Sequence, residues 1–201
     1  MGLNSESISY YYEKNLEGPI LITPTSFSDE RGFFMESWNF KEWEKVLKKH
    51  NQKINNFVQD NHSKSSKGVL RGLHFQKNPF AQGKLVRCTF GRIFDVAVDI
   101  RTNSPTFGKW VGEFLSSENK KQLWVPVGFA HGFLTVSNIA EVQYKTTNYY
   151  KKSHEGTINY LDKNINITWP KVFSETSLNY ELSEKDEKAP FLKELSKGDL
   201  F

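Results

Sequence analysis

The sequence contains one cysteine, Cys88, among its 201 residues, and this scarcity excludes a disulfide within the chain. A chain without disulfides is typical of a reducing compartment, and we expect Cys88, inside an apolar run, to be a core residue. No apolar run approaches the ~20 residues that span a bilayer, and the polar N-terminus lacks the apolar core of a signal peptide. We therefore expect a cytoplasmic protein that has no membrane partner.

Long basic runs are absent too, although the net charge is +4 and the isoelectric point is about 9.0. Binding of nucleic acid usually requires basic residues that cluster on one face, so we expect no nucleic-acid partner. The scattered positive charge fits ordinary solubility, and it also fits a small phosphorylated ligand.

Aromatic residues are abundant, at 14% of the chain, and aromatic enrichment favours sheets over helical bundles. The segment 39–49 predicts the one clear early helix. Its apolar residues Phe40, Trp43, Val46 and Leu47 fall on one helical face.

Most of the remaining chain consists of short apolar segments that glycines separate. They predict strands at 20–23, 57–60, 69–75, 84–90, 93–100, 110–115, 123–126, 132–136 and 141–147. Strands this short and evenly spaced indicate a sandwich or a barrel, so we expect a mainly β protein with a few short helices. We expect residues 1–17 to form an N-terminal arm, and residues 18–201 to form one domain that includes the C-terminal tail.

His74 follows Arg71 and Gly72 in one predicted strand. In a regular strand Arg71 and His74 point to opposite faces, which would make His74 an ordinary core histidine. A bulge at Gly72 would instead turn both side chains into one cavity. The strand alone leaves both interpretations open. We expect His50, at the end of the predicted helix, to be structural.

The segment Pro126-Val127-Gly128-Phe129-Ala130-His131 matches the second motif of cupin barrels, Pro-x-Gly-x-x-His. A metal-binding cupin also needs His-x-His in its first motif, and the corresponding stretch here is His74-Phe75-Gln76. Two histidines are too few for a transition metal, which usually takes three or more protein ligands. We therefore predict a cupin-like barrel with no metal and no cofactor, suited to acid–base chemistry or to plain binding.

The strand 93–100 has two different faces. Its apolar face carries Phe94, Val96, Val98 and Ile100, and its other face carries Asp95, Ala97 and Asp99. Alternation alone does not decide which face points inward. If the strands 84–90 and 93–100 pair, Asp95 and Lys84 can form a structural ion pair.

Six segments, in this order, closely resemble the dTDP-4-dehydrorhamnose 3,5-epimerase family. They are 28–34, 69–76, 82–86, 94–101, 128–133 and 144–150, within a match from about 18 to 190. The resemblance implies a homodimeric jelly-roll barrel of the cupin type that needs no cofactor. It also implies a dTDP-sugar substrate, dTDP-4-dehydro-6-deoxy-D-glucose, whose C3 and C5 are inverted through enolates to give dTDP-4-dehydro-L-rhamnose. The usual destination of this sugar is a surface polysaccharide.

The same resemblance assigns four catalytic roles. His74 resembles the base that removes a proton next to the C4 ketone, and Asp186 resembles the aspartate that orients it. Tyr144 resembles the acid on the opposite face, and Lys84 resembles the group that stabilises the C4 oxyanion. Asp95 and Asp99 are rival candidates for the partner of His74.

The remaining roles implied by the resemblance are contacts to the substrate. The expected pyrophosphate contacts are Arg31 and Arg71, because guanidinium groups suit phosphate oxygens. The expected nucleotide contacts are Phe34, Glu36, Gln59 and Asn61, with Tyr150 stacking on the base. The expected sugar contacts are His131 and Phe133.

Three other functions need similar residues. An epimerase that inverts only C3 or only C5 would need nearly the same set, because the difference lies in how the sugar ring turns. A 3,4-ketoisomerase on a related barrel is disfavoured by the epimerase-like surroundings of Lys84 and Tyr144. A non-catalytic sugar-nucleotide binding module would be expected to lose the base or the acid, and this sequence keeps both.

Overall fold

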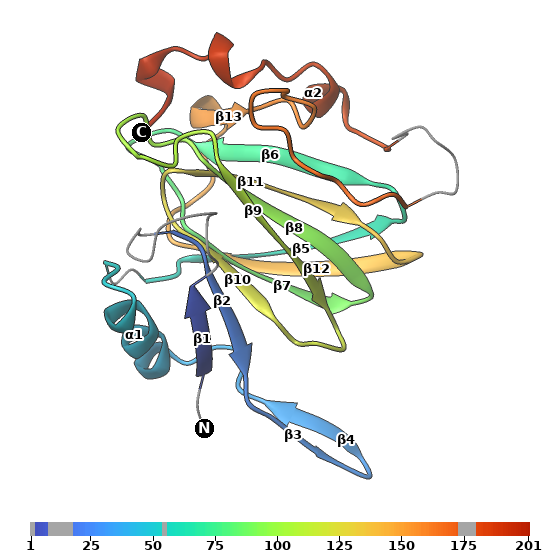
Figure 1. Ribbon diagram of the computed structural model, residues 1–201. Helices are drawn as coiled ribbons and strands as arrows, with labels where there is room; N and C mark the ends of the chain where they lie inside the picture. The colour runs from blue at the N-terminus through green and yellow to red at the C-terminus, as the bar shows by residue number, and fades with distance from the viewer. Residues whose placement is uncertain (1–2, 8–17, 54–55, 173–179) are drawn as a thin grey trace.

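A computed structural model describes residues 3–7, 18–53, 56–172 and 180–201 (Figure 1). Of the expected N-terminal arm, residues 1–2 and 8–17 lie outside the described residues. Residues 3–7 form a strand that pairs antiparallel with the strand beginning at Ile20, so this part of the arm extends a sheet.

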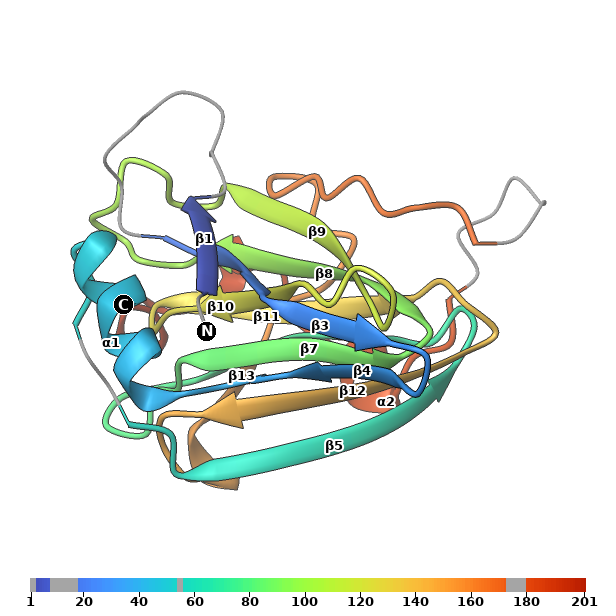
Figure 2. The same ribbon diagram turned by 90° about the horizontal axis from the view of Figure 1, so that it is seen from below.

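Two antiparallel sheets face each other and form the barrel (Figures 1 and 2). The six-stranded sheet has the order β1 (Leu3–Ser7), β2 (Ile20–Pro24), β10 (Gln122–Val125), β7 (Lys84–Phe90), β12 (Ile139–Thr146) and β5 (Gln59–Ser66). The five-stranded sheet has the order β13 (Glu155–Thr157), β6 (Leu70–Gln76), β11 (Phe129–Thr135), β8 (Arg92–Asp99) and β9 (Trp110–Ser116). This architecture confirms the expected mainly β fold class.

Strand β8 shows how the sheets share the core. Ile93 and Ala97 belong to the interior cluster between the sheets, on the same face as the fully buried Asp95. Phe94 and Val96 point the other way and belong to the cluster that the C-terminal segment covers. The acidic face of this strand is therefore the inner one.

The expected pairing of the strands 84–90 and 93–100 is wrong. β7 pairs with β10 and β12, whereas β8 pairs with β11 and β9 in the opposite sheet. The chain crosses between the sheets at Gly91, whose φ is +73°. A Cβ there would lie 2.1 Å from the carbonyl oxygen of Ile139, so the corner packs against β12 with no room for a side chain.

Helix α1 (Phe40–Lys49) covers the outer face of the six-stranded sheet. It begins one residue later than expected, because the Asn39 side chain caps it by accepting a hydrogen bond from the Lys41 amide at 3.0 Å. Trp43, Val46 and Leu47 are buried as predicted, and each contributes about 1.5–3 kcal/mol by leaving water. Phe40 remains 37% exposed, so it belongs only partly to the apolar face.

The C-terminal segment covers the outer face of the five-stranded sheet. It contains α2 (Glu184–Glu187), η2 (Leu192–Glu194) and η3 (Lys197–Asp199), which lie above β6 in Figure 1. The Leu70 amide at the start of β6 donates to the Glu181 carbonyl at 3.0 Å, which anchors the chain just before α2. This anchor holds α2 beside the strand that carries His74.

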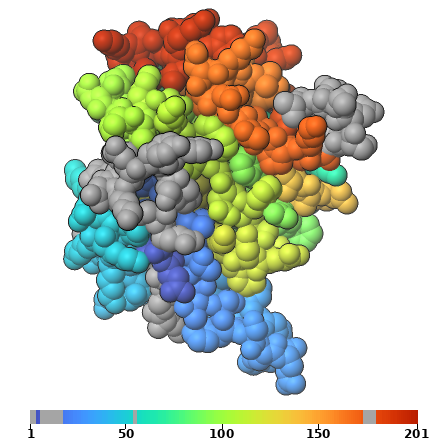
Figure 3. Space-filling view, in the orientation of Figure 1, coloured from blue at the N-terminus to red at the C-terminus, as the bar shows by residue number. Residues whose placement is uncertain are grey.

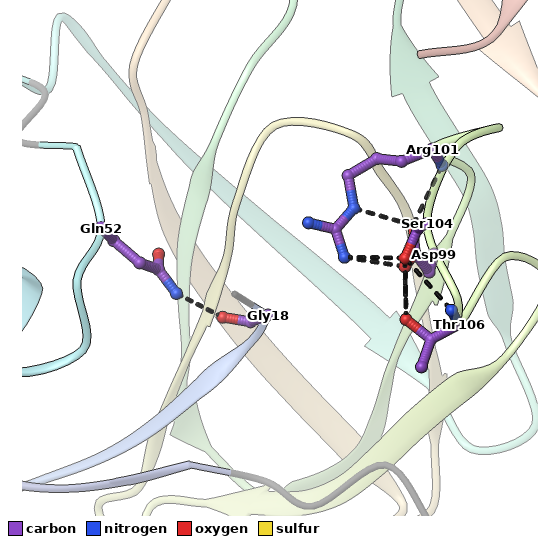
Figure 4. A network of polar contacts seen from close by, with 6 residues as sticks. All are labelled: Gly18, Gln52, Asp99, Arg101, Ser104 and Thr106. Carbon is purple, nitrogen blue, oxygen red and sulfur yellow. Dashed lines mark hydrogen bonds and ion pairs between the residues drawn. The ribbon is translucent and has the colours of Figure 1, made fainter. Parts of the chain in front are cut away.

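The end of β8 is fixed by a polar network around the buried carboxylate of Asp99 (Figure 4). Arg101 donates two side-chain hydrogen bonds to it, at 2.9 and 2.8 Å, and the hydroxyls of Ser104 and Thr106 donate at 2.6 and 2.7 Å. Because both carboxylate oxygens of Asp99 accept hydrogen bonds from residues of this loop, Asp99 is a structural residue. It is not the partner of His74.

A hairpin of β3 (Ser26–Asp29) and β4 (Gly32–Met35) projects away from the barrel (Figures 1 and 3). Its aromatic side chains Phe27, Phe33 and Phe34 are 50–62% exposed. Apolar surface of this kind on a projecting element is typical of a contact with another molecule.

One predicted strand was misplaced. The expected strand 57–60 is in fact β5 (Gln59–Ser66), an eight-residue strand whose sequence is polar throughout. It lies at the edge of its sheet and carries no apolar alternation, so periodicity could not find it. No helix in the described part of the chain is long and apolar enough to cross a membrane.

Candidate active site

A bulge in β6 brings Arg71 and His74 to the same cavity. His74 faces His131 of β11, but Arg71 faces Phe133, so three steps along β6 oppose two along β11. Gly72 in the bulge has a φ of +141°, and a Cβ there would lie 2.5 Å from the Cα of Gly132. Only glycine fits this close approach, so of the two interpretations that the sequence left open, the structure has the bulge at Gly72.

A cavity of about 810 Å³ opens between the sheets beside this bulge. Seven of the residues expected at the site line it: Arg71, His74, Lys84, His131, Phe133, Tyr144 and Asp186. The five-stranded sheet supplies His74 and His131, whereas the six-stranded sheet supplies Lys84 and Tyr144. A ligand in the cavity would therefore meet different functional groups on its two faces.

His74 and Asp186 form a short pair, with 2.6 Å between the imidazole Nε2 and the carboxylate Oδ1. Asp186 lies in the first turn of α2, where the Ser183 hydroxyl accepts a hydrogen bond from its amide, and it is 2% exposed. Burial lowers the pKa of His74 below the ordinary imidazole value, and Asp186 only partly opposes this effect. The imidazole is therefore neutral at pH 7, with one ring nitrogen held by Asp186 and the other able to take a proton.

Lys84 is the buried cation of the cavity. Its side chain donates to the His74 carbonyl at 3.3 Å, so it bridges from β7 to the opposite sheet. Burial lowers the pKa of Lys84 to about 8, an effect that the charges of Asp95 and Glu155 oppose. The amine is therefore still protonated at pH 7, but only narrowly, and it can place a positive charge beside a developing oxyanion.

Tyr144 approaches the cavity from β12, next to the strand of Lys84. Burial raises its pKa above the ordinary phenol value, and the nearby Glu155 adds to the rise, whereas Arg71 opposes it. The phenol therefore stays protonated at neutral pH and can donate a proton from the sheet opposite His74.

A smaller hollow of about 110 Å³ adjoins the cavity and shares His74, Lys84 and Tyr144 with it. Gln59, Asn61 and Tyr150 line this hollow, as expected for residues near one ligand. The Gln59 amide donates to the Asn61 side chain at 2.9 Å and accepts from the Tyr150 backbone at 3.2 Å. Three of the expected nucleotide contacts thus form one connected wall.

The other three expected contacts do not reach the cavity of their own chain. Arg31 lies at the tip of the β3–β4 hairpin, 84% exposed in its side chain, and pairs with Asp29 at 2.6 Å. Phe34 is on the same hairpin, 62% exposed. Glu36 accepts hydrogen bonds from Asn39 at the start of α1.

Four charged residues that line the cavity were missed from the sequence, namely Lys64, Glu155, Glu181 and Lys185. Glu155 of β13 and Lys185 of α2 both line the cavity and form an ion pair at 2.8 Å. Lys185 directly precedes Asp186, which was expected at the site, so its place in the sequence could have indicated that it lies there too. Glu155 lies in a polar stretch without any recognisable pattern, and only the pairing of β13 with β6 places it here.

Among the described residues, no group of three His, Cys, Asp or Glu side chains is arranged to hold a metal ion. Asp95, the remaining rival for His74, instead accepts a hydrogen bond from His131 at 2.9 Å. Asp186 is thus the carboxylate in contact with His74.

A matching family model and two similar sequences carry the same enzyme name. A family model described as dTDP-4-dehydrorhamnose 3,5-epimerase matches residues 13–194. The enzyme of that name from Salmonella typhimurium is 58% identical over 173 residues, which are 86% of this chain and 90% of the relative. The one from Methanothermobacter thermautotrophicus is 44% identical and covers 92% of this chain and 95% of its own.

Similar structures agree with the sequences. The dTDP-6-deoxy-D-glucose-3,5-epimerase of Legionella pneumophila, solved with dTDP-4-keto-L-rhamnose, has a TM-score of 0.86 and 45% identity, covering 98% of this chain and 97% of its own. A 3'-monoepimerase from Streptomyces bikiniensis, solved with dTDP-quinovose, has a TM-score of 0.79 and 29% identity, covering 90% of this chain and 86% of its own. With a family model over most of its length and relatives this similar, the chain belongs to the dTDP-4-dehydrorhamnose 3,5-epimerase family.

Proposed function

We propose that the protein inverts C3 and C5 of dTDP-4-dehydro-6-deoxy-D-glucose and yields dTDP-4-dehydro-L-rhamnose for dTDP-L-rhamnose biosynthesis in the cytoplasm. The observation that carries this proposal is the placement of a neutral His74–Asp186 pair and a protonated Tyr144 on opposite sheets of one cavity. Epimerisation needs this arrangement, because the proton must leave one face of the carbon and return to the other.

The chemistry follows from the C4 ketone, which makes the hydrogens at C3 and C5 acidic. His74 takes a proton from the carbon, and the electron pair of the broken C–H bond moves to the C4 oxygen as an enolate. The ammonium of Lys84 stabilises that oxygen. Tyr144 then protonates the carbon from the opposite face. The imidazolium then releases its proton to water and the phenolate takes one up from water, so both groups return to their starting state and no oxidant or reductant is consumed.

Product analysis tests the assignment. The sugar nucleotide is incubated with the protein, the ketone is reduced with borohydride, and the released 6-deoxyhexoses are identified by chromatography against standards. We expect sugars with the L-rhamnose configuration at C3 and C5. Sugars inverted at one carbon only would support the single-epimerase alternative. The structurally similar 3'-monoepimerase of Streptomyces bikiniensis is an example of such an enzyme. Unchanged substrate with tight binding would support a non-catalytic module.

Asp186 gives a prediction for the pH dependence. Its carboxylate raises the pKa of His74 and so partly offsets the effect of burial. In the wild type, activity should fall as the pH drops through the lowered His74 pKa, because the protonated imidazole cannot act as a base. Asp186→Asn should move this acid limb to still lower pH and reduce kcat on the order of 10²-fold or more, because the ring loses its orientation. A kcat profile unchanged in both position and height would contradict the pairing.

We also propose that the active protein is a homodimer in which each β3–β4 hairpin reaches the cavity of the other subunit. Arg31 and Phe34, two expected substrate contacts, lie on this exposed hairpin and outside the cavity of their own chain. A second copy of the chain is the simplest source of a cavity that this hairpin could complete. Twofold dimers are also the commonest assembly.

Mixing two impaired variants tests this arrangement. Arg31→Ala alone should lower kcat/KM about ten- to a hundredfold, because a charge-assisted hydrogen bond to phosphate is lost. When it is mixed and reassembled with His74→Ala, half of the dimers are hybrids, and each hybrid has one intact site if the hairpin acts across subunits. About a quarter of the wild-type activity should then return. No recovery, with hybrid dimers demonstrated by mass spectrometry, would mean that Arg31 acts within its own chain.

A further inference from the structure

Asp95 is a buried carboxylate that the proposed chemistry does not use. Its side chain is 0% exposed, and its Oδ1 accepts a hydrogen bond from His131 Nε2 at 2.9 Å. Its other oxygen, Oδ2, is buried and has no hydrogen-bond partner among the described residues. An unpaired oxygen on a buried carboxylate is costly, so its presence in the barrel interior requires a reason.

A functional cation, Lys84, enters the same interior from the opposite sheet. Asp95 points inward from β8, and Lys84 lies on β7. Among the described residues, no carboxylate lies within 4.0 Å of the Lys84 amine, which therefore remains available to a ligand. Asp95 makes the largest contribution opposing the effect of burial on the pKa of Lys84, which burial lowers to about 8.

We propose that Asp95 is a positioning residue that keeps Lys84 charged and aimed at the substrate's C4 oxygen while it fixes His131 in the cavity wall. The inference deepens the proposed epimerase function and rests on it. An ammonium in a dry cavity tends to lose its proton, and a neutral amine stabilises an oxyanion poorly. A fixed negative charge in the interior opposes this loss, and Asp95 supplies one without lining the cavity that would hold the substrate.

The other ionisable groups around Lys84 do not supply this charge equally. They are Arg71 and His74 on β6, His131 on β11, Tyr144 on β12, Glu155 on β13, and Lys185 and Asp186 on α2. His74 is neutral at pH 7, and Tyr144 keeps its proton. Glu155 is paired with Lys185 at 2.8 Å, and Lys185 itself disfavours a charged Lys84. Asp186 is held by His74 at 2.6 Å, and Asp95 is the carboxylate that most favours the charged form of Lys84.

The test is Asp95→Asn, which keeps the shape and removes the charge. The amine of Lys84 is followed by NMR in protein labelled with [ε-13C]lysine, with Lys84→Met used to identify its signal. We expect the titration of Lys84 to move to lower pH. We also expect kcat to fall about tenfold at pH 8 and less at lower pH, where the amine recovers its proton.

The matched control is Asp99→Asn, on the same strand and equally buried, but held by Arg101, Ser104 and Thr106 (Figure 4). It should leave the Lys84 titration where it is. Asp95→Ser provides a second way to remove the charge if the asparagine variant does not fold.

The outcomes separate this inference from the proposed function. An unshifted Lys84 titration in a folded Asp95 variant would overturn the inference while the epimerase activity stands. An equal loss of kcat at every pH would show that Asp95 is merely structural, and would overturn it too. If the wild type did not epimerise at all, the proposed function would fail, yet the Lys84 titration could still be measured in both proteins.

Discussion

Replacement of His74 by alanine should reduce kcat about 10²- to 10⁴-fold, the usual contribution of a general base. The loss is expected because His74 is the neutral base in the cavity, and because Asp186 fixes the orientation of its ring through a 2.6 Å contact at Nε2. Affinity for dTDP should be largely retained, because the side chains expected to contact the nucleotide in the adjoining hollow and on the hairpin are still present. Steady-state kinetics and calorimetric titration with dTDP measure the two effects separately.

Two further variants make this result specific. His74→Asn retains a side-chain donor for the buried Asp186 but has no basic nitrogen, so it should be folded and as inactive as the alanine variant. His154→Ala removes a histidine that packs against Phe80 outside the cavity, and it should be fully active. Wild-type turnover in either His74 variant would contradict the assignment of the base.

Replacement of Tyr144 by phenylalanine should separate proton removal from inversion. Without the phenol, the enolate still forms at His74, but the proton returns from the face that it left. We therefore expect inversion to fall about 10²- to 10⁴-fold, while the substrate continues to exchange its C3 or C5 hydrogen with deuterium from D2O. Proton NMR follows exchange and product formation in one sample.

The control for this experiment is Tyr149→Phe, in which an exposed tyrosine outside the cavity loses the same hydroxyl. It should behave as the wild type. Inversion by Tyr144→Phe at the wild-type rate would show that another group, or water, supplies the second proton, and it would remove Tyr144 from the mechanism.

The sequence could predict what depends on neighbouring residues. Gly72 between Arg71 and His74 made a bulge one of two interpretations, because glycine tolerates both the positive φ and the close backbone approach that a bulge requires. The apolar spacing within 39–49 indicated a helix, whose start shifted by one residue because Asn39 caps it. Such features are decided within a few residues, so local physical rules suffice.

Features that depend on tertiary pairing could not be predicted from local pattern. β7 and β8 are joined by Gly91 alone and look like a hairpin, yet they belong to opposite sheets because each pairs with strands from distant parts of the chain. Asp186 is 112 residues from His74, and only the family resemblance connected them. The alternation of side chains along β8 does not decide whether Asp95 points inward or outward. The C-terminal segment decides it, because it covers the opposite face of the strand.

The central claim is that one cavity deprotonates the sugar at both carbons next to the C4 ketone. The most direct measurement is incubation of dTDP-4-dehydro-6-deoxy-D-glucose with the wild-type protein in D2O, followed by proton NMR of the sugar. We expect loss of the C3 and C5 proton signals together with the appearance of the L-configured product. Product formed with either carbon still carrying its original hydrogen would contradict the enolate route at that carbon, and an unlabelled, unchanged sugar would contradict the account as a whole.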